Sequence, residues 1–99
     1  MGVLRDAIAD GADPTPPQSE EIARLRRRRE ELAAQVSRLQ WDLGGLTYEM
    51  AIRDHFRLDV LVRRAAILQE RDAELAEVER LLRSAEEAAR RAPSAGAPE

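Results

Sequence analysis

Leucines recur at every seventh residue along a stretch without proline, and this spacing limits the possible folds more than any other feature. Between Pro17 and Pro93 the sequence contains no proline, so no residue in that stretch forces a helix to end. Apolar residues at heptad spacing form one seam along a helix, and such seams pair in coiled coils. The predicted seam consists of Leu25, Leu32, Val36, Leu39, Leu43, Leu46, Met50, Leu61, Leu68, Leu75 and Leu82. The sequence therefore predicts an all-α coiled-coil protein that self-associates through this seam.

Local signals indicate where the helical region begins and ends. Thr15 is a favourable N-cap residue, Pro16 suits the first helical position, and Gln18 completes a capping box. After Arg91 the chain becomes rich in proline, glycine and alanine, which ends a helix. The predicted divisions are a flexible segment over residues 1–15 that could include a short helix, a coiled-coil helical domain over 16–91, and a disordered tail over 92–99.

The middle of the helical region leaves two architectures open. The seam steps by eleven residues from Met50 to Leu61, which in a coiled coil is a stutter that locally unwinds the supercoil. At about 100° per residue the leucines before and after this step share one face, which favours a single long helix over residues 16–91. Gly44 and Gly45 each disfavour a helix by about 1 kcal/mol relative to alanine. A helical hairpin broken at Gly44-Gly45 is therefore the alternative.

A second apolar face lies opposite the seam. Trp41, Tyr48 and His55 are spaced by seven residues, and Ile52 falls on the same side of a helix. A two-stranded coiled coil needs only one apolar stripe, so a second stripe implies another layer of helices, such as a four-helix bundle made from two hairpins. Aromatic residues at this spacing usually belong to a packed core. They could also anchor a docked protein, and both interpretations remain open.

The charge pattern does not favour nucleic acid as a partner. The chain has 16 basic and 19 acidic residues, which gives a formal net charge of −3. A run of arginines could contact phosphates, but glutamates flank it, and mixed-charge runs are typically ion-paired helix surfaces. The candidate phosphate contacts are Arg24, Arg26, Arg27, Arg28 and Arg29.

The sequence lacks most residues that catalysis or metal binding would need. It contains no cysteine and a single histidine, His55, so disulfides and thiolate metal sites are excluded. We therefore expect neither an enzyme nor a cofactor or metal site. The short apolar stretch near the N-terminus is interrupted by Arg5 and Asp6, and it is too short for a membrane span or a signal peptide. We expect a cytoplasmic protein without membrane association.

One segment resembles a known class of proteins. The motif runs through Leu43-Gly44, Tyr48-Glu49-Met50-Ala51, Arg53-Asp54-His55-Phe56, Leu58-Asp59-Val60-Leu61 and Arg64-Ala65-Ala66. Over roughly residues 40–83 it resembles the helical segment of uncharacterised bacterial proteins that end in a zinc ribbon. In that family paired CxxC motifs bind zinc. Because this chain has no cysteine, the resemblance implies a helical segment and no zinc site.

Together these patterns predict a non-enzymatic oligomerisation protein, scaffold or adaptor that acts through helix–helix association. The expected partner is a second copy of the chain, in a dimer or tetramer, or another helical protein. One alternative is a docking module that uses Trp41, Tyr48, Ile52 and His55. The other is weak nucleic-acid binding through the arginines from Arg24 to Arg29.

Overall fold

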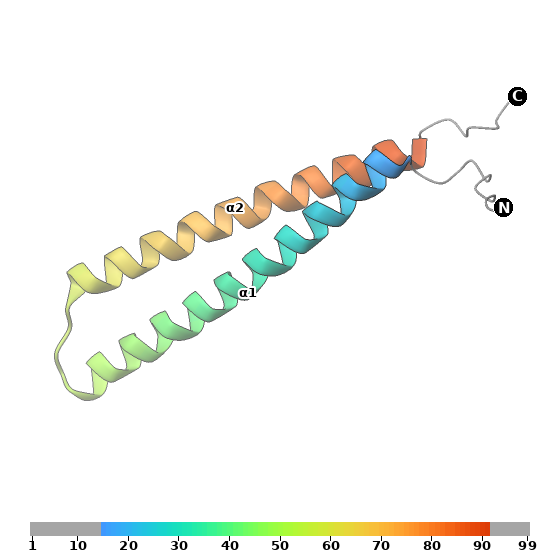
Figure 1. Cartoon of the computed structure of the whole chain (residues 1–99). Coiled ribbons are helices and arrows are strands. Elements are labelled where there is room, and N and C mark those ends of the chain that lie inside the picture. Colours follow the sequence, from blue (N-terminus) through green and yellow to red (C-terminus); the bar gives the residue numbers. More distant parts are fainter. Residues whose placement is uncertain (1–14, 92–99) are drawn as a thin grey trace, which may run out of the picture. The chain divides into compact units, whose positions relative to one another are not determined.

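The computed structural model describes residues 15–91 and contains two long α-helices in that range (Figure 1). Helix α1 spans Pro16–Ile52 and helix α2 spans Leu58–Arg91. No strand occurs among residues 15–91, so the predicted all-α class is confirmed. Helix α1 begins at the predicted residue, and α2 extends to Arg91, the last residue that the structure describes. The predictions for residues 1–14 and for the tail lie outside the described residues.

The start of α1 is fixed by the predicted capping box. The Thr15 backbone N–H donates to Gln18 Oε1 at 2.9 Å, and the Gln18 backbone N–H donates to Thr15 Oγ1 at 3.2 Å. These reciprocal bonds satisfy two N–H groups that have no partner inside a helix. The helix therefore begins where the local sequence predicts.

The helices contribute to two compact units, which are described separately. Among the described residues, the first unit joins residues 15–27 with residues 79–91. Its core is a cluster of buried side chains from both helices, with two half-buried neighbours. The cluster consists of Ile22, Leu82 and Ala89, with Leu25 and Ala85 packed against it. Arg26 Nη2 and Glu86 Oε2 form an ion pair across the same two helical segments at 2.8 Å.

The second unit covers Arg28–Val78 and is a helical hairpin that includes the turn. Its buried side chains come from both arms and are Leu32, Val36, Met50 and Val78. Arg28 Nη2 donates to Glu74 Oε2 at 2.7 Å, and Arg28 Nη1 donates to Glu31 Oε1 at 3.0 Å. The first of these bonds joins the two arms. The arms are therefore held together by an apolar interior and by polar contacts along its edge.

Helix α1 ends in a Schellman motif. The His55 N–H donates to the Met50 carbonyl at 2.9 Å, and the Asp54 N–H donates to the Ala51 carbonyl at 3.1 Å. This pair of bonds satisfies two carbonyl groups at the helix end, and it requires a left-handed residue in the position of Asp54. Asp54 has a φ of 54°, a conformation that aspartate adopts more readily than most side chains. The helix therefore stops here without a glycine or proline.

Helix α2 begins at Leu58, three residues after His55. The Val60 and Leu61 N–H groups both donate to the Arg57 carbonyl, at 3.1 and 3.2 Å. The Arg57 guanidinium donates to both carboxylate oxygens of Asp59, at 3.3 and 3.2 Å. A carboxylate in the first turn also interacts favourably with the positive end of the helix dipole.

Two parts of the predicted architecture need correction. The structure does not contain a single helix over residues 16–91, and the break does not fall at Gly44-Gly45, because both glycines lie inside α1. The turn at residues 53–57 falls within the eleven-residue step between Met50 and Leu61. From the heptad pattern alone, this step indicates a stutter within a continuous helix. Because the chain leaves the helix at residues 53–57, the shared phase of the leucines before and after this step does not show that the helix continues through it.

Candidate functional site

The structure covers the predicted seam within one chain. All eleven predicted seam residues are buried or half-buried, and Leu32 is completely buried. The sequence pattern assigned this seam to contacts between copies. The fold instead packs Leu25 of α1 against the cluster that includes Leu82 of α2 in the first unit, and it buries or half-buries the seam residues of both arms in the second. Self-association through the seam stays a prediction, and little of its apolar surface remains exposed for it.

The buried set extends further toward the outer helix ends than the predicted seam. Ile22 and Ala89 are both buried in the first unit. Ile22 precedes Leu25 by three residues, and Ala89 follows Leu82 by seven. Both spacings continue the apolar stripe of their helix, so the heptad signal could have found them.

The predicted docking face is exposed in the second unit. The exposed fraction is 82% for Trp41 and 65% for Tyr48. Ile52 is also exposed, and helical spacing places it on the same side of α1 as the two aromatic residues. His55 is exposed as well, but it lies in the turn after the helix has ended. The structure therefore brings Trp41, Tyr48 and Ile52 together on one face and places His55 beyond it.

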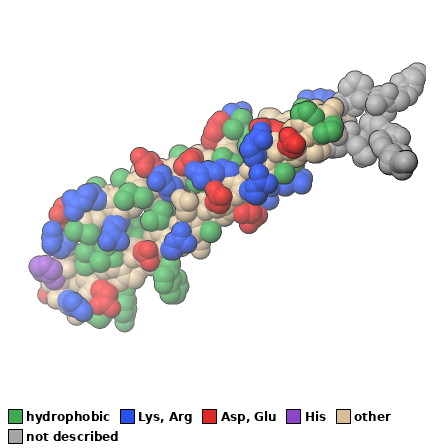
Figure 2. All heavy atoms as spheres, viewed as in Figure 1, with side chains coloured by type: hydrophobic (Ala, Val, Ile, Leu, Met, Phe, Trp, Pro, Cys, Tyr) green, Lys and Arg blue, Asp and Glu red, His purple; other side chains and the backbone are tan. Residues whose placement is uncertain are grey.

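Further apolar side chains are exposed close to the turn. Figure 2 shows hydrophobic side chains gathered over this part of the hairpin. The sequence analysis did not select these residues, although Leu58 and Val62 lie four apart and off the seam, which places them on a second stripe of α2. The additional exposed residues of the second unit are Phe56, Leu58, Val62 and Ile67.

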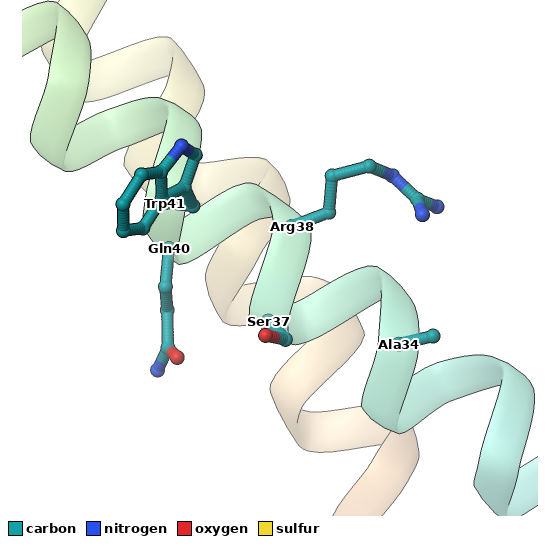
Figure 3. Close-up of a pocket in the computed structure, with 5 residues that line it drawn as sticks. All are labelled: Ala34, Ser37, Arg38, Gln40 and Trp41. Atoms are coloured by element: carbon teal, nitrogen blue, oxygen red, sulfur yellow. The ribbon is translucent and has the colours of Figure 1, made fainter.

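The docking face contains two shallow hollows. One, of about 340 Å³, is lined by residues from Gln40 to Tyr48 that include both glycines, namely Gln40, Trp41, Gly44, Gly45 and Tyr48. The other is lined by Ala34, Ser37, Arg38, Gln40 and Trp41. All five residues come from α1, and Trp41 and Gln40 extend to one side of it while Arg38 extends to the other (Figure 3). The hollows are therefore features of one helix face.

Most of the arginine cluster is engaged by carboxylates. Within residues 15–91, four of its five members form ion pairs with carboxylates. Hydrogen bonds from Arg28 to Glu74, and secondarily to Glu31, raise the pKa of Arg28. These contacts use guanidinium N–H groups that phosphate binding would need. The geometry therefore favours an ion-paired helix surface over a nucleic-acid interface. The pairs are Arg24 with Glu21, Arg26 with Glu86, Arg28 with Glu31 and Glu74, and Arg29 with Glu30.

Comparison with protein-family models, curated proteins and solved structures finds no match. The resemblance of residues 40–83 to the helical segment of zinc-ribbon proteins therefore stays a prediction.

The chemistry available at the docking face is that of an apolar binding surface. Among residues 15–91, no three histidine, cysteine, aspartate or glutamate side chains converge on a possible metal position. In the same range, neither helix is long and apolar enough to cross a membrane. The face offers two large aromatic rings, an aliphatic side chain and a pair of glycines.

Proposed function

We propose that this chain is a non-enzymatic helix-association module that binds another helical surface through the exposed face of α1 beside the turn. The observation that supports this proposal is the 82% exposure of Trp41, with Tyr48 and Ile52 on the same face. Burial of such a side chain contributes about 1.5–3 kcal/mol. Contiguous exposed apolar side chains of this kind mark interaction surfaces.

A helical partner fits the shape of this face. Trp41, Tyr48 and Ile52 follow the spacing by which an amphipathic helix presents its anchors. Tryptophan and tyrosine are enriched among the residues that dominate binding energy. The predicted docking module and the predicted helix–helix association can therefore use the same surface, the face of α1 that carries Trp41 and Tyr48. In this proposal the protein works as a scaffold or adaptor in the cytoplasm.

Site-specific photo-cross-linking tests the proposed function. A photoreactive amino acid at position 41 should produce a covalent protein adduct in the cells that make the chain. The matched control places the same amino acid at Gln69, an exposed position on α2 in the same unit. Residue 41 should cross-link strongly and residue 69 weakly.

The readout does not depend on knowing the partner. If position 41 gives no adduct with any protein, including a second copy of the chain, the face is not an association surface. Equal adduct yields from positions 41 and 69 would also contradict the proposal, because cross-linking would then be random.

A further inference from the structure

We propose that the partner of this face is a second copy of the same chain, which binds α1 against α1 in an antiparallel pair centred on Gly44-Gly45. The inference deepens the proposed association function and rests on it. In this arrangement Trp41 of each copy packs against Tyr48 of the other. The two hairpins then form a four-helix assembly with two-fold symmetry.

The spacing of the face is symmetric about its centre. Trp41 precedes Gly44 by three residues, and Tyr48 follows Gly45 by three residues. Each ring is therefore about 5 Å along the helix from the midpoint of the glycine pair, and both fall within about 10° of one line on the helix surface. A two-fold axis through that midpoint reverses the helix direction and places Trp41 opposite the second copy's Tyr48. A two-fold contact requires this kind of self-complementary surface.

Neither glycine is explained by the hairpin itself. Each costs about 1 kcal/mol relative to alanine inside a helix, yet neither has a positive φ. A Cβ atom added at Gly44 or Gly45 would meet nothing within 4 Å. Hence no contact within the chain requires a missing side chain at these positions. Contact with a second helix would use the missing side chains, because small residues allow two helix backbones to approach closely.

The exposed aromatic area suits a modest dimer interface. The exposed parts of Trp41 and Tyr48 amount to roughly 300 Å² per chain, taking about 200 Å² for each aromatic side chain. Two copies thus supply roughly 600 Å², about half of the ~1,200 Å² at which stable interfaces begin. Ile52, which is 60% exposed, and the exposed small residues at positions 34 and 37 on the same face add to this area.

A second copy also fits the charge distribution. Positions 34, 37, 41, 44, 45, 48 and 52 carry no charged side chain. Arg38 lies at the edge of the face, and antiparallel pairing keeps its two copies about 20 Å apart along the helix axis. Two identical faces can therefore meet without placing like charges together. Each antiparallel pair would contain two symmetry-related aromatic contacts, and such contacts stabilise association beyond the buried area alone.

The decisive variant is Gly45→Gln, studied in the full chain by sedimentation equilibrium. Glutamine favours the helix more than glycine does, and the open space at Gly45 accommodates it, so helix content should stay equal or rise. The added side chain fills the centre of the interface, and the dimer dissociation constant should increase at least tenfold. The control Ala73→Gln, at an exposed position on α2, should leave it unchanged.

Orientation is tested with a single spin label. The chain contains no cysteine, so Arg38→Cys provides one labelling site at the edge of the face. Antiparallel pairing places the two labels about 20 Å apart along the helix axis, whereas parallel pairing places them side by side. A dimer with side-by-side labels would overturn the antiparallel arrangement.

The outcomes separate this inference from the proposed function. A wild-type chain that remains monomeric at several hundred micromolar overturns the inference, as does a Gly45→Gln dimer of unchanged affinity. If position 41 then cross-links to a different protein, the association function stands and only the identity of the partner is wrong. If position 41 cross-links to nothing, both proposals fail.

Discussion

Leu32 and Leu81 show how differently two leucines of the same chain contribute to stability. Leu32 is completely buried in the second unit, whereas Leu81 is 39% exposed. Because the structure around a truncated buried side chain relaxes only partly, removal of Leu32 would lose both burial and packing contacts. A small helical unit has little free energy of unfolding in reserve.

We expect Leu32→Ala to lower the free energy of unfolding by about 2–5 kcal/mol. The variant should lose most of its helical circular dichroism at temperatures where the wild-type chain remains folded. Leu81→Ala is the matched control because it deletes the same atoms from a partly exposed position. It should lower the free energy of unfolding by much less than Leu32→Ala. Equal thermal shifts for the two variants would contradict the burial pattern.

Asp54 determines where the chain turns, through its backbone conformation. A left-handed residue at a helix end is usually glycine, which adopts this conformation without a steric cost. Asp54→Gly should therefore stabilise the chain by about 0.5–1 kcal/mol, and Asp54→Val should destabilise it. Urea titrations of the two variants would measure the difference. If Asp54→Gly instead lowers the free energy of unfolding, the interactions of the Asp54 side chain stabilise the fold by more than its left-handed backbone conformation destabilises it.

At the scale of elements, the helix ends are set by different kinds of interaction. The start of α1 depends on side-chain capping by Thr15 and Gln18, and its end depends on backbone bonds around Asp54. The start of α2 adds an electrostatic contribution, because the hydrogen bond from Arg57 is the main reason that the pKa of Asp59 is lowered. The beginning of α2 should thus respond to pH.

A carboxyl group whose pKa is lowered by folding stabilises the folded state above its unfolded pKa of about 3.9. That contribution is lost as the pH falls through the lower folded pKa. Acidification from about pH 5 to about pH 2.5 should therefore destabilise the wild-type chain more than Asp59→Asn. Thermal unfolding at both pH values would measure this difference. If the unfolding temperatures of the wild-type chain and Asp59→Asn fall by the same amount on acidification, the Asp59 carboxylate has no stabilising role.

At the scale of the whole molecule, the reversal of the chain is the main structural result. The cluster of Ile22, Leu82 and Ala89 brings the start of α1 against the end of α2 within the first unit. A single helix would instead separate these segments along its entire length. The fold therefore makes a distance prediction that does not depend on any partner.

Spin labels at the exposed positions Glu20 and Glu87, both in the first unit, should lie within about 25 Å of each other, given helix axes about 10 Å apart. A continuous helix would place them about 100 Å apart at about 1.5 Å per residue. Labelled chains must be diluted with unlabelled ones so that only the distance within one chain is measured. A distance near the larger value would exclude the reversal.

The sequence alone determined the helical class, the start of the helical region at residue 16, and the residues that form the seam and the docking face. These properties follow from interactions between residues a few positions apart. The capping box at Thr15 is complete within four residues, and heptad spacing fixes which side chains share a face. For the same reason the sequence placed Trp41, Tyr48 and Ile52 on one face.

Only the tertiary structure decided the position of the turn and what covers each face. The turn depends on Asp54, which has a left-handed backbone conformation. Composition instead predicted a break at the two glycines, which lie inside α1. Periodicity shows that side chains share a face but not whether that face meets the same chain, another chain or water. The reversal at residues 53–57 covers the leucine seam and leaves Trp41 exposed, because helices joined by so short a turn pack against each other along their most apolar stripes.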